Sequence, residues 1–228
     1  NALQLGSLER VLAGDVTSYK NDRKLASFLG RVNYAFADKY LLTASVRRDG
    51  SSVFGANHRW GTFPSVAAAW RISEESFLDN APFLYDLKLR AGYGITGNQQ
   101  GLYPQQSQQL VGASGTAFFN GGLITNFAVT QNANSDLRWE TRKQTNIGLD
   151  FAFFKGRLSG TADVYTATTD HLLFNYTVPQ PPYPYPSIAA NVGSLKNEGI
   201  EVALDYKLIS GRELSVSLAG NASFVRNK

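Results

Sequence analysis

The sequence predicts an all-β protein, folded as the wall of an antiparallel transmembrane β-barrel. Three observations predict this fold. Apolar residues recur at every second position along most of the chain, which is the period of a strand and not of a helix. The alternating segments run for about 9–14 residues, whereas soluble strands cluster near 5–6 and a membrane strand needs about 9–11. Tight turns join the segments at one end and long loops join them at the other, as in outer-membrane barrels.

Composition excludes several other classes of protein. The 228 residues carry 22 Lys and Arg against 18 Asp and Glu, a net charge of +4. Because no basic run is interleaved with stacking aromatics, we expect no nucleic-acid partner. The chain has no Cys, which excludes disulfides, thiolate metal sites and a cysteine nucleophile. No apolar stretch is long enough for a transmembrane helix. We also expect no cofactor.

The first elements form a hairpin after a poorly periodic start. Residues 1–24 show no clear period, and we expect them to be the end of a loop. Apolar and polar residues alternate over 28–36, and a three-residue turn leads into a second alternating run at 40–48. Such a pair of runs predicts a β-hairpin. A polar loop that contains glycine is expected at 49–59.

The middle of the chain continues the pattern and then loses it. A strand is expected at 60–72, with Pro64 at a bulge or near the strand start, because proline cannot donate to a ladder. A short helix-like stretch, which Ser73 could cap, is expected within 73–83, and alternation returns over 87–96. From 97 to 136 the pattern dissolves into Gly, Gln, Asn, Ser and aromatics. A loop of that length is usually functional.

Four more strands follow in two hairpins. We expect them at 137–154, 157–173, 199–206 and 214–224, which gives about eight strands in all. A second long loop, rich in Pro and Tyr, spans 174–191. If the apolar faces of these strands touch lipid, then their polar faces line a watery interior.

Charged side chains recur on that polar face. The predicted interior residues are Arg31, Arg47, Asp150, Asp163, Glu201 and Asp205. We expect the four carboxylates to pair with Arg31 or Arg47 across strands, as structural charge. A transport role for any one of them does not follow from the pattern.

Several long motifs resemble a known family. "FLGRVNYAFADKYLLTASVRRDGSSVFGANHRWGTFPSVAAAWRISEESFL" is similar to the middle of the barrel of SusC/RagA-like, TonB-dependent outer-membrane transporters of Bacteroidetes. "LKLRAGYGITGNQ", "LRWETRKQTNIGLDFAFFKGRLSGTADVY" and "NVGSLKNEGIEVAL" resemble later segments of the same family, in the same order. The resemblance covers about residues 25–228, and long motifs in the right order are highly specific.

The resemblance implies a fold and a function. It implies a barrel of about 22 strands around an N-terminal plug. Residues 25–228 would be part of the C-terminal half of that barrel in the outer membrane, and residues 1–24 would end an extracellular loop. The implied activity is active import of oligosaccharides or peptides, driven by the TonB complex through parts outside this chain. A SusD-like surface lipoprotein would be the partner, and no enzymatic reaction is implied.

Two other classes stay open at this stage. A self-contained eight-stranded outer-membrane barrel, structural or hydrolytic, would pair its first strand with its last. A soluble carbohydrate-binding β-sandwich would fold without detergent.

His58 and His171, the only histidines, could act as a general base with Asp49 or Asp170. Lone histidines in loops are more often solvated bystanders.

Two segments are candidates for ligand or partner contact. Tyr176, Tyr183 and Tyr185 lie in the Pro-rich loop, where proline lowers the entropy lost on binding and tyrosine offers flat amphipathic surface. A stiff loop packed on its neighbours is the equally weighted alternative. Arg48 and Asp49 lie at a strand-to-loop junction that could contact an anion or a partner. A turn with geometry set by Asp49 and Gly50 is the favoured structural interpretation.

Overall fold

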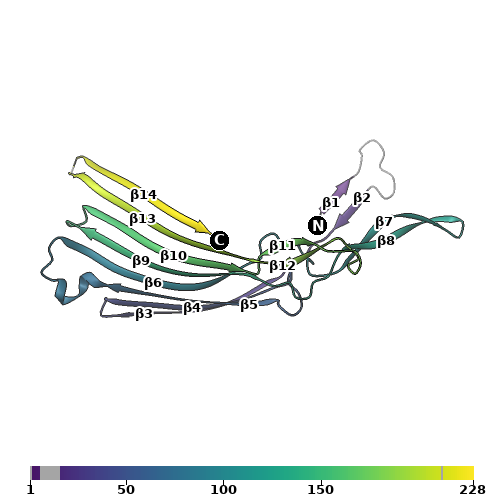
Figure 1. Ribbon diagram of the computed structural model, residues 1–228, viewed down its shortest axis with the longest axis horizontal. Helices are drawn as coiled ribbons and strands as arrows, with labels where there is room; N and C mark the ends of the chain where they lie inside the picture. Colours follow the sequence, from purple (N-terminus) through teal and green to yellow (C-terminus); the bar gives the residue numbers. More distant parts are fainter. Residues whose placement is uncertain (1, 6–15, 212) are drawn as a thin grey trace.

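The computed structural model describes residues 2–5, 16–211 and 213–228, and one eight-stranded antiparallel sheet dominates it (Figure 1). The strand order is β14-β13-β10-β9-β6-β5-β4-β3, so the sheet follows the chain from one edge to the other. The eight strands are β3 (Leu25–Phe36), β4 (Tyr40–Ser51), β5 (Trp60–Arg71), β6 (Leu84–Asn98), β9 (Glu140–Phe153), β10 (Leu158–Asp170), β13 (Ser194–Ser210) and β14 (Ser215–Asn227). The predicted number of wall strands is therefore confirmed.

The register sorts the side chains onto two different faces. Ile147, Val164, Ile200 and Phe224 occupy one row across β9, β10, β13 and β14. Their side chains are each more than half exposed, because nothing in the described structure packs on this apolar face. A soluble β-sandwich would bury such a row against a second sheet. The sandwich alternative is therefore wrong.

The sheet is open at both edges. β3 pairs only with β4, and β14 pairs only with β13, within the described residues. The first and last strands do not meet, so the alternative of a closed eight-stranded barrel is also wrong for this chain. A curved antiparallel sheet with one exposed apolar face is part of the wall of a larger barrel.

The connections differ sharply between the two ends of the sheet. Short turns at 37–39 and 154–157 join β3 to β4 and β9 to β10 at the left of Figure 1. The helix-like stretch expected within 73–83 contains two 3₁₀ turns, Ile72–Glu74 and Ser76–Leu78. The predicted cap at Ser73 is wrong, because Arg71 and Glu75 are the N-caps and neither turn has a side-chain cap. Across the described part of the chain, none of the helical segments has the length and apolar character to span a membrane.

The long connections contain additional strands that the sequence did not predict. The stretch 97–136 holds a hairpin of β7 (Leu110–Phe119) and β8 (Gly122–Gln131), which extends away from the sheet in Figure 1. The Pro- and Tyr-rich loop is flanked by β11 (Leu173–Thr177) and β12 (Ser187–Asn191), which pair with each other. Within residues 1–24, β1 (Ala2–Leu5) pairs with β2 (Val16–Tyr19). Residues 6–15 lie outside the described part, and the placement of 1–24 at an extracellular loop end stays a prediction.

Two strands differ from the prediction in detail. β4 continues to Ser51, so Asp49 lies in a strand and the loop begins later than expected. Pro64 is the fifth residue of β5, and β5 pairs with β6 only from Ser65 onward. The missing N–H of Pro64 therefore costs no hydrogen bond in the β5–β6 ladder.

Candidate functional site

The buried core of the described structure lies among the long connections and the strand end next to them, where β5 contributes Phe63. Its members are Val53, Phe54, Phe63, Leu137, Trp139 and Ala189. Trp139 is central: its ring lies 4.6 Å from that of Phe54 and 5.5 Å, edge to face, from that of Phe63. Its indole Nε1 donates to the carbonyl of Arg59 at 3.1 Å. Aromatic packing of this kind fixes the connections on the end of the sheet.

Asn132 ties the first long connection to the Pro- and Tyr-rich loop. It is 4% exposed, and its Nδ2 donates to the carbonyls of Tyr185 at 2.6 Å and Ser187 at 2.9 Å. Its Oδ1 accepts from the backbone N–H of Tyr185 at 3.2 Å. The buried side-chain amide of Asn132 thus satisfies backbone groups of the Pro- and Tyr-rich loop that would otherwise pair within a sheet.

Asn134 and Asn191 extend this clamp. Nδ2 of Asn134 donates to the carbonyl of Ala189 at 2.8 Å. The side chain of Asn191 accepts from the backbone N–H of Arg138 at 2.9 Å and donates to its carbonyl at 2.8 Å. The two long connections are therefore one ordered unit and not independent flexible loops.

A hollow of about 630 Å³ opens beside this unit, on the polar face of the sheet. Residues that line it include Arg47, Asp49, Phe63, Asn98, Gln100 and Trp139. The wall combines amide and charged groups with the small exposed parts of Phe63 and Trp139, which offers hydrogen bonds beside apolar contacts. Such a surface can form hydrogen bonds with a polar ligand.

The structure separates the two predicted residues of the strand-to-loop junction. The guanidinium of Arg48 lies over the ring of Trp60 at 5.5 Å, on the apolar face. Asp49 is 6% exposed on the opposite face and accepts from Nε of Arg47 at 2.8 Å. Asp49 is thus held in the strand by an ion pair, and its side chain lines the hollow. Arg48 does not line the hollow.

The three predicted tyrosines share one connection but have different surroundings. Tyr176 is 56% exposed on β11, and Tyr183 is 38% exposed. Tyr185 is half-buried, and Asn132 holds its backbone. The packed-loop interpretation therefore fits Tyr185, whereas contact of Tyr176 and Tyr183 with a ligand or partner stays a prediction.

The predicted interior charges share one face, but their partners differ from the prediction. Asp150 and Asp163 pair with Arg90, at 2.8 Å and 3.0 Å, and Lys88 adds a contact of 2.9 Å to Asp150. Arg47 pairs with Asp49. Within the described residues, Arg31, Glu201 and Asp205 form no ion pair, so the predicted pairing with Arg31 or Arg47 is wrong. Sequence reasoning missed Lys88 and Arg90, although they alternate with Leu87 and Leu89.

Within the described residues, the histidines do not pair with the carboxylates that the sequence suggested. Nε2 of His58 lies 3.7 Å from a carboxylate oxygen of Asp136, and neither Asp49 nor Asp170 is its partner. The described part of the chain brings no group of three or more His, Asp or Glu residues together as metal ligands.

Comparison with known proteins assigns the chain to a family. The family described as "TonB dependent receptor-like, beta-barrel" matches residues 5–228. The chain belongs to this family. It is part of an outer-membrane β-barrel, and the resemblance seen in the sequence motifs is confirmed. The apolar face of this receptor segment therefore contacts lipid, its long connections are extracellular, and its short turns are periplasmic.

Relatives of the receptor segment support this assignment. It is 40% identical to TonB-dependent receptor P39 of Formosa agariphila over 208 residues, which cover 90% of this chain and 19% of that protein. It is 36% identical to TonB-dependent receptor SusC of Bacteroides thetaiotaomicron over 220 residues, which cover 93% of this chain and 21% of that protein. The chain thus spans about a fifth of the length of these relatives.

Solved structures are similar in fold. The RagAB peptide importer in its open-open state matches with a TM-score of 0.81 and 31% identity, over 90% of this chain and 22% of that chain. The siderophore receptor PirA of Pseudomonas aeruginosa matches with a TM-score of 0.59 and 17% identity, over 90% of this chain and 34% of that chain. The second match shows the shared barrel fold alone.

Proposed function

We propose that the protein carrying this segment imports oligosaccharides or peptides across the outer membrane by TonB-dependent active transport. Membership of the receptor family and a membrane wall with one polar face support the proposal. Energy would reach the transporter from the TonB complex through parts outside this chain. No covalent chemistry is expected.

The observation that carries the proposal is the hollow of about 630 Å³ at the extracellular end of the polar face. Trp139 and Phe63, although almost fully buried, form part of its apolar wall, and Arg47 and Asp49 give it charge at a fixed separation. The clamp made by Asn132, Asn134 and Asn191 orders the connections around it before a ligand arrives. Preorganisation of this kind lowers the entropy lost on binding.

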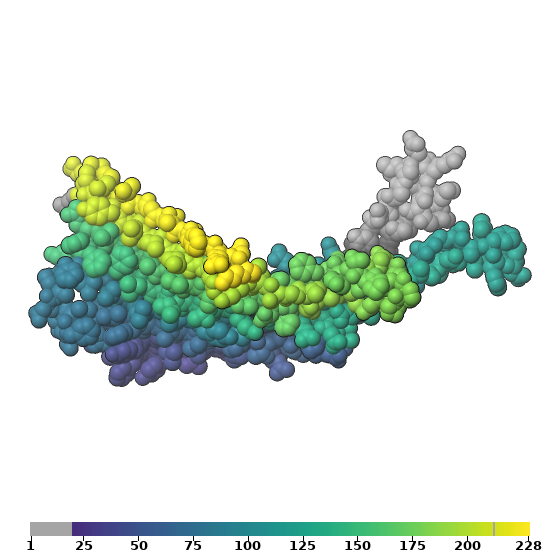
Figure 2. All heavy atoms as spheres, in the orientation of Figure 1, coloured from purple at the N-terminus to yellow at the C-terminus, as the bar shows by residue number. Residues whose placement is uncertain are grey.

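We propose a SusD-like surface lipoprotein as the partner, with the β7–β8 hairpin as one of its contacts. The hairpin extends beyond the sheet at the extracellular end (Figure 2). Phe118, Phe119 and Leu123 at its tip are 73%, 69% and 74% exposed. A two-stranded hairpin with bare aromatic residues is marginal in water and is stabilised when a partner covers it.

Isolation of the full-length protein from outer membranes tests both parts of the proposal. We expect a surface lipoprotein to copurify, and we expect mass spectrometry of the complex to find bound oligosaccharide or peptide. A Phe118→Ser/Leu123→Ser variant should lose the lipoprotein. Val111→Ser, another exposed apolar position on the hairpin but farther from its tip, should keep it.

Growth of cells on candidate nutrients tests the transport itself. We expect deletion of the protein, or of TonB, to abolish growth on the ligand that copurifies. Unchanged growth after deletion, with an empty binding site in the isolated protein, would contradict import as the function.

A further inference from the structure

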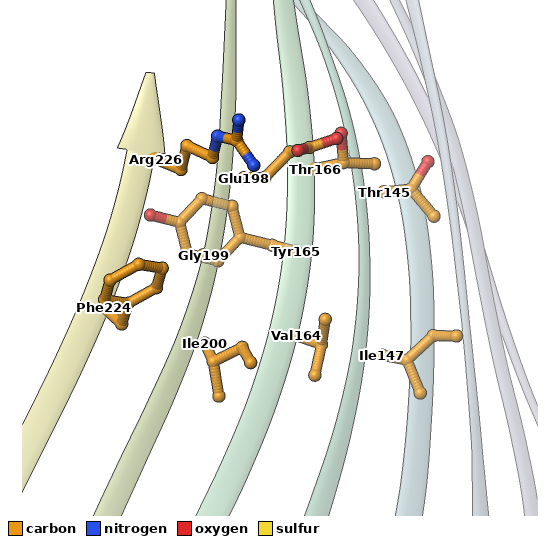
Figure 3. Close-up of a pocket in the computed structure, with 10 residues that line it drawn as sticks. All are labelled: Thr145, Ile147, Val164, Tyr165, Thr166, Glu198, Gly199, Ile200, Phe224 and Arg226. Carbon is orange, nitrogen blue, oxygen red and sulfur yellow. The ribbon is translucent and has the colours of Figure 1, made fainter. Parts of the chain in front are cut away.

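The lipid-facing side of the sheet changes character row by row toward its extracellular end. The last fully apolar row across β9, β10, β13 and β14 is Ile147, Val164, Ile200 and Phe224 (Figure 3). The next row on the same face is Thr145, Thr166, Glu198 and Arg226. The third row is Lys143, Thr168, Lys196 and Lys228. Three lysines thus share one row, which lies two rows above the last apolar row.

The charges in these rows are organised and have a positive excess. Glu198 lies between two lysines, in contact with Lys196 and 3.6 Å from Lys228. Nζ of Lys143 pairs with Asp170 at 2.9 Å. Four cations therefore face two carboxylates, and Arg226 forms no ion pair within the described residues. Glu198 holds the ammonium groups of β13 and β14 close together, so an anion can contact both.

A shallow groove of about 420 Å³ runs beneath these charges. Ile147, Val164, Ile200 and Phe224 line its apolar part, and Glu198 and Arg226 line its charged end. Figure 3 shows Arg226 and Glu198 above Ile200 and Phe224. The groove is complementary to an amphiphilic ligand, because its apolar part ends at a cationic edge.

We propose that this groove binds a phosphorylated lipid of the outer leaflet, with an acyl chain along the apolar row and a phosphate against Lys196, Arg226 and Lys228. The apolar face of the wall contacts the bilayer, and the cationic rows lie where the apolar band ends, which is the level of the headgroups. Basic clusters at this level bind anionic lipid headgroups. The guanidinium of arginine can donate two parallel hydrogen bonds to a phosphate, and the ammonium groups of lysine add compact positive charges.

A protein partner fits this surface less well. The exposed apolar row lies on the face that the bilayer covers, so a soluble partner would have to displace lipid to reach it. A free phosphate would use the cations but would leave the apolar groove unused. Charge and shape together therefore favour a lipid.

Lipid binding to the delipidated full-length protein tests the proposal. Native mass spectrometry would compare diphosphorylated lipid A with its dephosphorylated form, for the parent protein and for Lys196→Gln/Lys228→Gln. Lys155→Gln/Lys207→Gln is the matched control, because it removes two positive charges near the opposite end of the sheet. The folded state of each variant is checked by its mobility on an unheated gel.

We expect the parent and the control to bind the phosphorylated lipid alike, and Lys196→Gln/Lys228→Gln to bind it about tenfold more weakly or worse. The dephosphorylated lipid should bind weakly to all three proteins. Equal retention of phosphorylated lipid by the test variant and the control would overturn the proposal. So would equal binding of the two lipids, or release of the bound lipid by millimolar inorganic phosphate.

Discussion

The guanidinium of Arg90 on β6 donates to the carboxylate of Asp163 on β10 at 3.0 Å, across the intervening strand β9. Both residues lie opposite Gly148 of β9. A Cβ at Gly148 would overlap Oδ1 of Asp163 and would lie 2.6 Å from Nη2 of Arg90. The missing side chain at Gly148 is therefore what lets the two charges meet over the middle strand.

Gly148→Ala should destabilise the wall for this reason. The added methyl group displaces the Arg90–Asp163 pair, and the expected loss is about 1–3 kcal/mol in the free energy of unfolding. Denaturant unfolding of the full-length receptor, followed by tryptophan fluorescence, measures it. Gly220→Ala is the control, because a Cβ at Gly220 meets no atom within 4 Å. Equal stability of the two variants would show that Gly148 does not hold this pair in place.

Arg90→Gln should cost more stability than Asp163→Asn. Loss of the arginine leaves two carboxylates close together, with Lys88 as the remaining cation for Asp150 at 2.9 Å. An uncompensated, partly buried charge costs about 1–3 kcal/mol. Asp205→Asn removes a polar-face carboxylate with no ion pair within the described residues, and should change the free energy of unfolding by less than about 0.5 kcal/mol. The reverse order, with Asp163→Asn the more damaging change, would contradict this account.

The sequence predicted the wall well because its signal is local. Alternation over 28–36 and 40–48 marks β3 and β4 directly, since each strand exposes one face to lipid and one to water. The β7–β8 hairpin lacks that asymmetry: apolar side chains are exposed on both of its faces, as at Phe118 and Phe119. Its Gly- and Ser-rich sequence therefore predicts a loop and not a strand pair.

The charge partners could not be predicted because they depend on register. Arg90 and Asp163 are 73 residues apart in sequence and lie on strands that are not neighbours. Alternation shows which face each occupies, but not which row. Likewise, the part played by Asn132 depends on how two distant connections pack, and nothing in its local sequence marks it.

Asn132→Ala should loosen the extracellular unit without weakening the wall. The change leaves the carbonyls of Tyr185 and Ser187 without their buried donor, which costs about 1–3 kcal/mol locally. Hydrogen exchange of residues 183–189 should accelerate, while that of β9 and β10 stays unchanged. Asn175→Ala, at an exposed position on β11, is the matched control and should leave exchange as in the parent. Unaltered exchange in Asn132→Ala would show that the clamp does not order this loop.

The periplasmic turn should respond to acid through Glu75. Its carboxylate accepts from the hydroxyl of Tyr40 at 2.7 Å, from Nε1 of Trp70 at 3.0 Å and from Nζ of Lys39 at 3.2 Å. These bonds, that of Tyr40 foremost, hold the pKa of Glu75 below its ordinary value of 4.5. Because the pKa of Glu75 is lowered in the folded state, its ionised carboxylate stabilises that state at any pH above the ordinary pKa. This stabilisation is lost as the pH falls through the lowered pKa.

Glu75→Gln measures that contribution. The parent should melt at a higher temperature than Glu75→Gln at pH 7, and the difference should vanish as the medium is acidified below the lowered pKa. Glu74→Gln, one position away, leaves the three bonds to Glu75 intact and should follow the acid response of the parent. A difference between parent and Glu75→Gln that stays constant at every pH would refute the assignment.

The central claim is that alternate residues of these strands face lipid and water. The chain contains no cysteine, so single cysteines placed along β13 of the full-length receptor can carry spin labels, once any cysteine elsewhere is replaced. At Ile200, Val202 and Leu204 the label should collide mainly with dissolved oxygen, and at Glu201, Ala203 and Asp205 mainly with a water-soluble nickel complex. Collision rates that alternate with a period of two residues are the predicted result. Equal exposure to the nickel complex at neighbouring positions would contradict a membrane wall.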